Sequence, residues 1–150
     1  MNRRGSALIE LSLSATLLVT LLAGAVQYGY TFYVYSQLHA AVRNGARYAG
    51  QRPFTAASPA CVARMQEAIR KRVVYGAPDA PEDAVAVVRG LRPEHIAVEF
   101  QADSKGVPAE VTVAVQGFPV DSVFTTYTFQ GKPATTMPYL GRYAPTECEP

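Results

Sequence analysis

Proline is absent from the first 52 residues of this chain, and acidic side chains are almost absent from the same region. Glu10 is its one carboxylate, and no charged residue of either sign lies between Leu11 and Val26. Without proline, nothing interrupts a helix from about Ser6 to about Gly50, which would be about 65 Å long at 1.5 Å per residue. The sequence therefore predicts one long N-terminal helix, and the charged and proline-containing residues beyond it form a separate region.

Catalytic and metal-binding signatures are also absent. The sequence contains no Gly-x-Ser-x-Gly motif, no phosphate-binding loop and no Gly-x-Gly-x-x-Gly motif. His39 and His95 have no acid or nucleophile at a catalytic spacing, so we interpret both as solvated or structural. The two cysteines and two histidines lack the compact spacing of a zinc site. The net charge of +2, without a basic stripe, gives no indication of nucleic-acid binding. We therefore expect no enzymatic activity, no cofactor and no metal.

The segment Ala7–Val26 is long and apolar enough to cross a membrane. As a helix it would span about 30 Å, close to the hydrocarbon thickness of a bilayer. Arg3 and Arg4 precede it. The positive-inside rule then places the N-terminus in the cytoplasm and the rest of the chain on the other side. Aromatic residues typical of a membrane–water boundary follow the segment: Tyr28, Tyr30, Phe32, Tyr33 and Tyr35.

Two simple interpretations of this segment stay open at this point. One is a cleaved secretory signal with a cleavage site around Ala23-Gly24-Ala25, and the other is an inert single-pass anchor. Neither explains Glu10. A charged side chain costs about 2.5–3.5 kcal/mol near the bilayer centre and less near its boundary, so a carboxylate there usually has a cationic or hydrogen-bonding partner.

The residues Gly5-Ser6-Ala7-Leu8-Ile9-Glu10 resemble the cleavage motif of type IV prepilins. In that family a prepilin peptidase on the cytoplasmic side cuts after the glycine. The new amino terminus then becomes the cationic partner of a glutamate in a neighbouring subunit. The resemblance implies a cut between Gly5 and Ser6, and an assembly role for the Glu10 carboxylate.

The end of the long helix resembles that of TadE-like proteins of the tight-adherence (Tad/Flp) pilus. The resemblance is carried by Ala40 to Ala49, which read Ala-Ala-Val-Arg-Asn-Gly-Ala-Arg-Tyr-Ala. That family combines a prepilin-like N-terminus with a small exported domain that contains β-strands. Leu11 follows Glu10 here, whereas the shorter major pilins of these systems have tyrosine, which favours a minor pseudopilin. The resemblance covers about the first third of the chain.

Small and polar residues along the helix predict close helix packing. Thr16, Thr20 and Gly24 share one sector within the apolar segment, and Ala41, Gly45 and Ala49 recur every four residues further on. Arg43 and Arg47 have no acidic residue nearby in the sequence. They either contact a partner, or form a solvated helix face or pair with the chain's own domain.

Residues 53–150 predict an α+β domain in which a short helix packs on a small, mostly antiparallel sheet. Apolar residues spaced for one helix face predict a helix from about Ala60 to Tyr75, ended by Gly76 and Pro78. Period-two alternation predicts strands around Val85–Arg89, Ile96–Phe100 and Val111–Val115. The last two would form a hairpin that ends at Phe118-Pro119. Extended segments are also expected over Val123–Phe129 and, as an edge strand, Ala134–Tyr139.

Cys61 and Cys148 both follow the apolar segment. In an exported domain two cysteines favour a disulfide, which would tie the C-terminal tail to the short helix. The alternative is two separate thiols.

Together these features predict a leader over residues 1–5, a long helix over 6–52 and an exported domain over 53–150. The expected function is that of a TadE-like minor pseudopilin in the bacterial inner membrane, cut by a prepilin peptidase and involved in pilus assembly and surface attachment. Its expected partners are other pilin or pseudopilin subunits, the peptidase, the inner-membrane assembly platform and membrane lipid. The alternatives are a type II secretion pseudopilin and an unprocessed, membrane-anchored periplasmic binding module.

Overall fold

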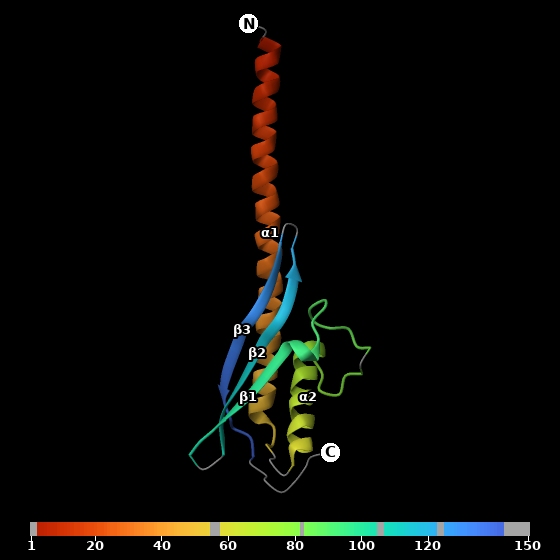
Figure 1. Cartoon of the computed structure of the whole chain (residues 1–150), viewed down its shortest axis with the longest axis vertical. Coiled ribbons are helices and arrows are strands. Elements are labelled where there is room, and N and C mark those ends of the chain that lie inside the picture. The colour runs from red at the N-terminus through yellow and green to blue at the C-terminus, as the bar shows by residue number, and fades with distance from the viewer. Residues whose placement is uncertain (1–2, 55–57, 82, 105–106, 123–124, 143–150) are drawn as a thin grey trace.

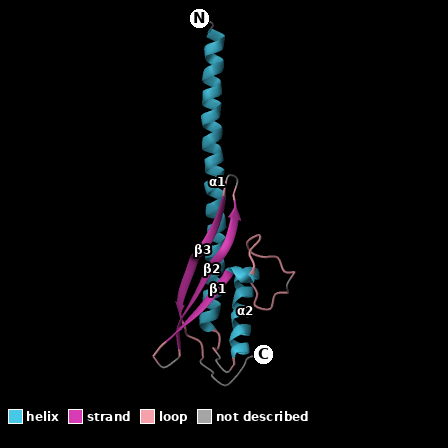
Figure 2. Cartoon of the chain, in the orientation of Figure 1, coloured by secondary structure: helices cyan, strands magenta, loops and turns pink. Residues whose placement is uncertain are grey.

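The computed structural model describes residues 3–54, 58–81, 83–104, 107–122 and 125–142. Its elements are α1 (Arg3–Gln51), α2 (Pro59–Tyr75), the short 3-10 helix η1 (Pro93–His95), β1 (Ile96–Ala102), β2 (Pro108–Asp121) and β3 (Thr126–Pro138). The N-terminal half of α1 stands clear of everything else, and its C-terminal half lies behind the sheet (Figure 1). A second helix beside a three-stranded antiparallel sheet confirms the predicted α+β class (Figure 2).

The C-terminal half of α1 is part of the hydrophobic core. Val34, Leu38, Val42, Ala46 and Ala49 are all buried, and they pack with residues of α2 and the sheet. Their spacing of three or four residues places them on one side of the helix. The apolar side chains of the N-terminal half are exposed, because no other element reaches them. One continuous helix therefore has a C-terminal half packed in the domain core and an N-terminal half that is exposed.

Helix α2 has clear sequence signals at both ends. The Ser58 hydroxyl accepts a hydrogen bond from the Cys61 N–H at 3.3 Å, and Pro59 occupies the first helical position. Gly76 ends the helix at φ 78°, a left-handed conformation in which its N–H donates to the Arg72 carbonyl at 3.1 Å. The helix predicted from about Ala60 to Tyr75 is therefore confirmed.

Strands β1 and β2 form the predicted antiparallel hairpin, with Ile96 opposite Val115 and Phe100 opposite Val111. The inner face of the sheet packs on the two helices, and its apolar residues are buried: Ile96, Val98, Val111, Val113 and Val115. Alternation with a period of two identified this face from the sequence, because successive side chains in a strand point to opposite sides.

The prediction that the hairpin ends at Phe118-Pro119 was wrong. Strand β2 continues to Asp121, with Pro119 opposite Thr128 on β3. Strand β1 pairs with β2 only as far as Val115, so beyond that point β2 has a neighbour on one side alone. Proline lacks an N–H and is tolerated where a strand has a free edge. Pro119 would interrupt a central strand, but it lies in the part of β2 that pairs with β3 alone.

The two extended segments predicted near the C-terminus form one strand, β3, which runs from Thr126 to Pro138 at the edge of the sheet. Val123 lies outside the described residues. The register shifts between Ala114 and Gln116, where a step of two residues on β2 corresponds to a step of four on β3, from Ala134 to Gln130. Gly131 has φ 69° in this stretch, and the Lys132–Pro133 peptide bond is cis. The irregularity separates the halves that the sequence suggested, but pairing with β2 continues on both sides of it.

The strand predicted around Val85–Arg89 was also wrong. Residues 83–92 form an irregular loop, in which Val85 is 90% exposed and Val88 is buried. The loop is tied to the end of α2 by a hydrogen bond of 2.8 Å from the Val87 N–H to the Val74 carbonyl. Its alternating valines do not share a buried face, and no neighbouring strand pairs with them in the described part of the chain.

Tyr139 joins the end of α1 to the segment that follows β3. Its hydroxyl donates to the Arg52 carbonyl at 2.5 Å, and nearby the Leu140 N–H donates to the Gly50 carbonyl at 2.8 Å. Burial raises the pKa of the Tyr139 hydroxyl, and a backbone hydrogen bond with Phe54 opposes that shift in part. The neutral phenol is therefore the form that stabilises this junction.

We expect Tyr139→Phe to lower the free energy of unfolding by about 1 kcal/mol, because one hydrogen bond to a backbone carbonyl is lost. A pKa raised above its unfolded value near 10 stabilises the fold fully below that pH, and the contribution is lost as pH rises through the folded-state value. The difference in stability between wild type and variant, measured by thermal unfolding, should therefore become smaller from pH 9 to pH 11. A gap that widens over this range would contradict the prediction.

Candidate functional site

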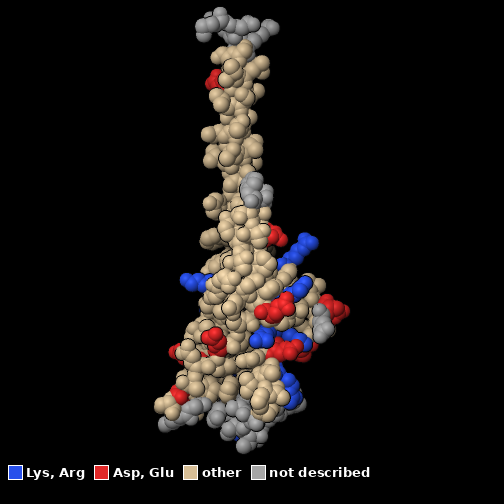
Figure 3. Space-filling model, in the orientation of Figure 1, with Lys and Arg blue, Asp and Glu red and all other residues tan. Residues whose placement is uncertain are grey.

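The N-terminal half of α1 presents a nearly uncharged apolar surface that no other described element covers. Leucine, isoleucine and valine side chains from Leu8 to Leu22 are 64–68% exposed. Glu10 is the one acidic residue between the start of the described chain and Gln51. In the view of Figure 3, one small acidic patch lies near the free end of the helix, and the rest of the described apolar half shows no charge. By length and composition, the helix is able to cross a membrane.

Glu10 is exposed, and it makes no hydrogen bond or ion pair with any described residue. The helix begins at Arg3, so Glu10 lies in its second turn, beyond the first turn in which the helix dipole best stabilises an anion. Its immediate neighbours Ile9 and Leu11 are apolar. In an apolar surrounding the carboxylate would therefore need a cationic or hydrogen-bonding partner from another molecule.

Gly5 and Ser6 lie in the first turns of α1 and are exposed. A side chain at Gly5 would meet no atom within 4 Å, so the peptide bond between these residues is open to another protein. Glu10 follows Ser6 by four residues, which places both on the same side of the helix. Ser6 and Glu10 therefore belong to one exposed side of the helix.

The hydroxyls of Ser12, Thr16 and Thr20 in the apolar half donate to backbone carbonyls of the helix itself. Thr16 donates to the Ser12 carbonyl and Thr20 to the Thr16 carbonyl, both at 2.8 Å. Such back-bonding satisfies these three donors and lowers the cost of burying them in an apolar surrounding. Thr16, Thr20 and Gly24 therefore offer a low-profile surface at little polar cost, and the structure places no other element of this chain against Thr16 or Thr20.

The second set of small residues, Ala41, Gly45 and Ala49, faces the chain's own core, where all three are buried. Gly45 lies against α2. A Cβ atom built on it would come within 2.1 Å of Cγ2 of Val73 and 3.9 Å of the Ile69 carbonyl oxygen. The spacing of four residues thus positions α2 against α1.

Arg43 and Arg47 point away from this core. Both are exposed, and neither forms a hydrogen bond or ion pair within the described residues. Their guanidinium groups are separated by one helical turn and lie on the side of α1 that the sheet and α2 leave open. This surface is available to a partner.

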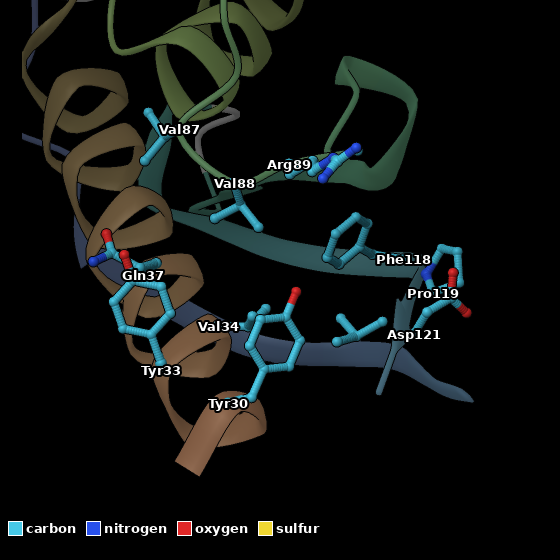
Figure 4. A pocket seen from close by; sticks show the side chains of 12 residues that line it. Tyr30, Tyr33, Val34, Gln37, Val87, Val88, Arg89, Phe118, Pro119 and Asp121 are labelled. Carbon is cyan, nitrogen blue, oxygen red and sulfur yellow. The ribbon is translucent and has the colours of Figure 1, made fainter. Parts of the chain in front are cut away.

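A hollow of about 650 Å³ lies where α1 leaves the domain, between α1, the 87–90 loop and the end of β2 (Figure 4). Tyr30 and Tyr33 line it from α1, Phe118 from β2, and the charged residues Arg89 and Asp121 lie at its margin. Sequence reasoning missed this hollow, because its walls come from three segments far apart in the chain. Its mixed lining does not select one chemistry.

We keep the interpretation of His39 and His95 as solvated or structural residues. His39 is exposed on α1, with its ring stacked 6.5 Å from that of Tyr35. The Nδ1 of His95 accepts a hydrogen bond from the Arg92 N–H at 3.2 Å. No cluster of three or more histidine, cysteine, aspartate or glutamate side chains that could hold a metal occurs in the described ranges.

Cys61 is buried in the first turn of α2, and its Sγ lies 3.0 Å from the Ser58 hydroxyl. Cys148 lies outside the described residues. The predicted disulfide between the two therefore stays a prediction.

The architecture defines a class: a small α+β domain built around the second half of one long helix, whose first half is apolar, uncovered and carries a single carboxylate.

Comparison with protein families specifies the class further. Residues 5–47 match the family model of the TadE-like proteins, which confirms the resemblance seen in the sequence. The matched region contains Gly5, Ser6, Glu10, both sets of small residues except Ala49, and both arginines. No curated protein and no solved structure matches the chain. The match indicates a protein associated with the Tad pilus, and it does not extend into the C-terminal domain.

Proposed function

We propose that this chain is a minor pseudopilin of a Tad/Flp-type pilus, with a structural rather than enzymatic role. The observation that carries the proposal is Glu10, an exposed carboxylate in an apolar helix, placed five residues after Gly5. The helix is inserted in the bacterial inner membrane with its N-terminus in the cytoplasm. A prepilin peptidase cuts between Gly5 and Ser6, and the C-terminal domain lies in the periplasm or on the assembled pilus.

Assembly follows from electrostatics in an apolar medium. After the cut, Ser6 carries a positive amino group, and Glu10 of a neighbouring subunit carries the negative charge. Each charge alone is costly in the bilayer, and pairing offsets much of that cost only when two helices have the correct axial offset. The proposed pair therefore fixes the register between subunits. Thr16, Thr20 and Gly24 provide the low-profile surface along which the helices pack.

Several features support this assignment over its alternatives. The family match spans the processing motif and continues to residue 47, beyond the region that secretion pseudopilins would share through the cleavage motif. An unprocessed anchor for a binding module would have no use for the carboxylate. The partners we propose are other pilin or pseudopilin subunits, the peptidase, the inner-membrane assembly platform and membrane lipid.

The first test of the proposal is processing. We expect co-expression with a Tad-system prepilin peptidase to remove Met1–Gly5, with Ser6 as the new N-terminus, because Gly5 lies in an uncovered stretch of helix. Intact-mass spectrometry of the membrane fraction measures the loss directly. Gly5→Leu should block the cut and provides the matched control. A wild-type chain that keeps its full mass beside an active peptidase would contradict the proposal.

A further inference from the structure

The outer face of the sheet has alanine and threonine side chains between two carboxylates. Three rows of residues cross it from β1 to β2 to β3. The first row is Ala97, Ala114 and Ala134; the second is Glu99, Thr112 and Thr136; the third is Gln101, Glu110 and Pro138. None of these nine residues is a cation. The two threonine hydroxyls bond each other at 2.8 Å. We call these three rows the sheet face, and their two charged residues are Glu99 and Glu110.

Glu99 and Glu110 are both exposed, and neither forms an ion pair with a described residue. Glu110 lies opposite Gln101, two residues along β1 from Glu99. With about 3.4 Å per residue and about 4.8 Å between strands, the two backbone positions are about 8 Å apart. The sheet face therefore presents two carboxylates at a defined spacing on a shallow surface.

The uncovered side of α1 within the domain has the opposite charge. Its centre is formed by Ser36, Ala40, Arg43 and Arg47, all exposed and brought to one side by spacings of three, four and seven residues. No aspartate or glutamate occurs in α1 after Glu10. This surface, called here the helix face, has two guanidinium groups about 6 Å apart along the axis, next to small side chains.

These two faces cannot meet within one molecule. The sheet packs its inner side on α1, and the sheet face looks away from α1 (Figure 1). The helix face lies on the side of α1 turned away from that packing. Positive and negative surfaces thus occupy opposite sides of a two-layer domain, and any contact between them joins two molecules.

We propose that the helix face of one copy of this chain docks on the sheet face of a second copy, with Arg43 and Arg47 paired to Glu99 and Glu110. The spacing within each charge pair matches to within the reach of these long side chains. Alanine and serine on the helix, and the alanine and threonine rows on the sheet, allow the close approach that a helix needs on a sheet.

A contact between two different faces is heterologous, so each copy keeps one free face of each kind and further copies can add. The inference deepens the proposed function and rests on it in one respect, since the N-terminal helices hold the domains side by side. The inference names a partner surface for Arg43 and Arg47, which the family match does not provide. Exposed pairs of this kind are screened by salt, so the contact should weaken between about 0.05 and 1 M salt.

The test uses two differently tagged full-length copies, co-expressed with the prepilin peptidase and co-purified in mild detergent at low salt. One variant reverses the helix face (Arg43→Glu with Arg47→Glu). The other reverses the sheet face (Glu99→Arg with Glu110→Arg). We expect each variant to lose self-association at least fivefold, because its two faces then carry like charge.

The decisive experiment is to mix the two charge-reversed variants and measure their co-purification. The reversed helix face of one variant is complementary to the reversed sheet face of the other, and their unchanged faces also match, so the mixed pair should recover association. A chain with all four substitutions should recover self-association as well. The exposed pair Asp79→Lys with Asp83→Lys serves as a charge control on the loop after α2 and should change nothing.

Two results would overturn the inference. Unchanged self-association in the single-face variants would show that the faces do not meet. Loss in both variants without recovery on mixing would show that they bind something other than a second copy. Processing and the effect of Glu10→Ala on pili test the proposed function by separate readouts, so failure of either proposal is recognised independently of the other.

Discussion

Replacing Glu10 by alanine is expected to leave removal of Met1–Gly5 intact and to lower incorporation of the subunit into the pilus by about a hundredfold. In the proposed mechanism the peptidase acts on the Gly5–Ser6 bond, which lies about one turn before Glu10 in an exposed stretch of helix. In the proposed mechanism, incorporation depends on pairing the Glu10 carboxylate with the amino group of a neighbouring subunit. Without the carboxylate, the amino group of the neighbour stays unpaired in hydrocarbon, at a cost of about 2.5–3.5 kcal/mol. Since about 1.4 kcal/mol corresponds to a factor of ten, this cost lowers incorporation by about a hundredfold.

The measurement compares the amount of mature subunit in sheared pili with the amount in membranes. Ser14→Ala is a suitable control, since Ser14 is also exposed on the apolar half and lies outside the packing surface proposed for Thr16, Thr20 and Gly24. We expect this variant to behave like wild type. Normal incorporation of the Glu10→Ala subunit would remove the role proposed for the carboxylate.

The second large effect is expected at Gly45, where any side chain collides with the core. A Cβ there would lie 2.1 Å from Cγ2 of Val73, a residue that is itself 1% exposed and has little room to move. Overpacking costs about 1–3 kcal/mol, and alanine regains about 1 kcal/mol of helix propensity. Gly45→Ala should therefore destabilise the domain by up to about 2 kcal/mol, and Gly45→Leu by about 3 kcal/mol.

Thermal unfolding of the full chain in detergent, followed by near-ultraviolet circular dichroism, measures both variants. Gly29→Ala is the matched control: a Cβ at Gly29 meets nothing within 4 Å, so only the propensity gain applies and stability should stay equal or rise. Combining Gly45→Ala with Val73→Ala should cost less than the sum of the two single changes. If Gly45→Leu unfolds at the wild-type temperature, the close packing of α1 and α2 at this position is wrong.

Much of this architecture was predictable because its signals are local. The absence of proline before Pro53 predicted α1, and Ser58, Pro59 and Gly76 mark the ends of α2 through caps that involve only neighbouring residues. The alternating valines of β1 and β2 predicted a hairpin whose inner face is buried. In each case one short stretch contains both the pattern and its physical cause.

The errors arose where a local pattern depends on distant partners. Val85 and Val87 alternate like a strand, but no described neighbour pairs with them. Pro119 would end a central strand, yet β1 has already stopped at that level and leaves an edge. Which strand lies beside a residue is decided by the register of the whole sheet, which no single stretch of sequence contains.

The amino-acid sequence by itself determined the N-terminal half of this protein: an apolar helix, the Gly5–Ser6 bond and the Glu10 carboxylate lie within a few residues of one another, so helix geometry alone relates them. Tertiary structure decided what the second half of the same helix does. Packing of α2 and the sheet against one side of it buries Gly45 and leaves Arg43 and Arg47 on the other. It also places Glu99 and Glu110 together on the far side of the sheet. These relations depend on contacts between elements far apart in the chain, and only the folded domain brings those elements together.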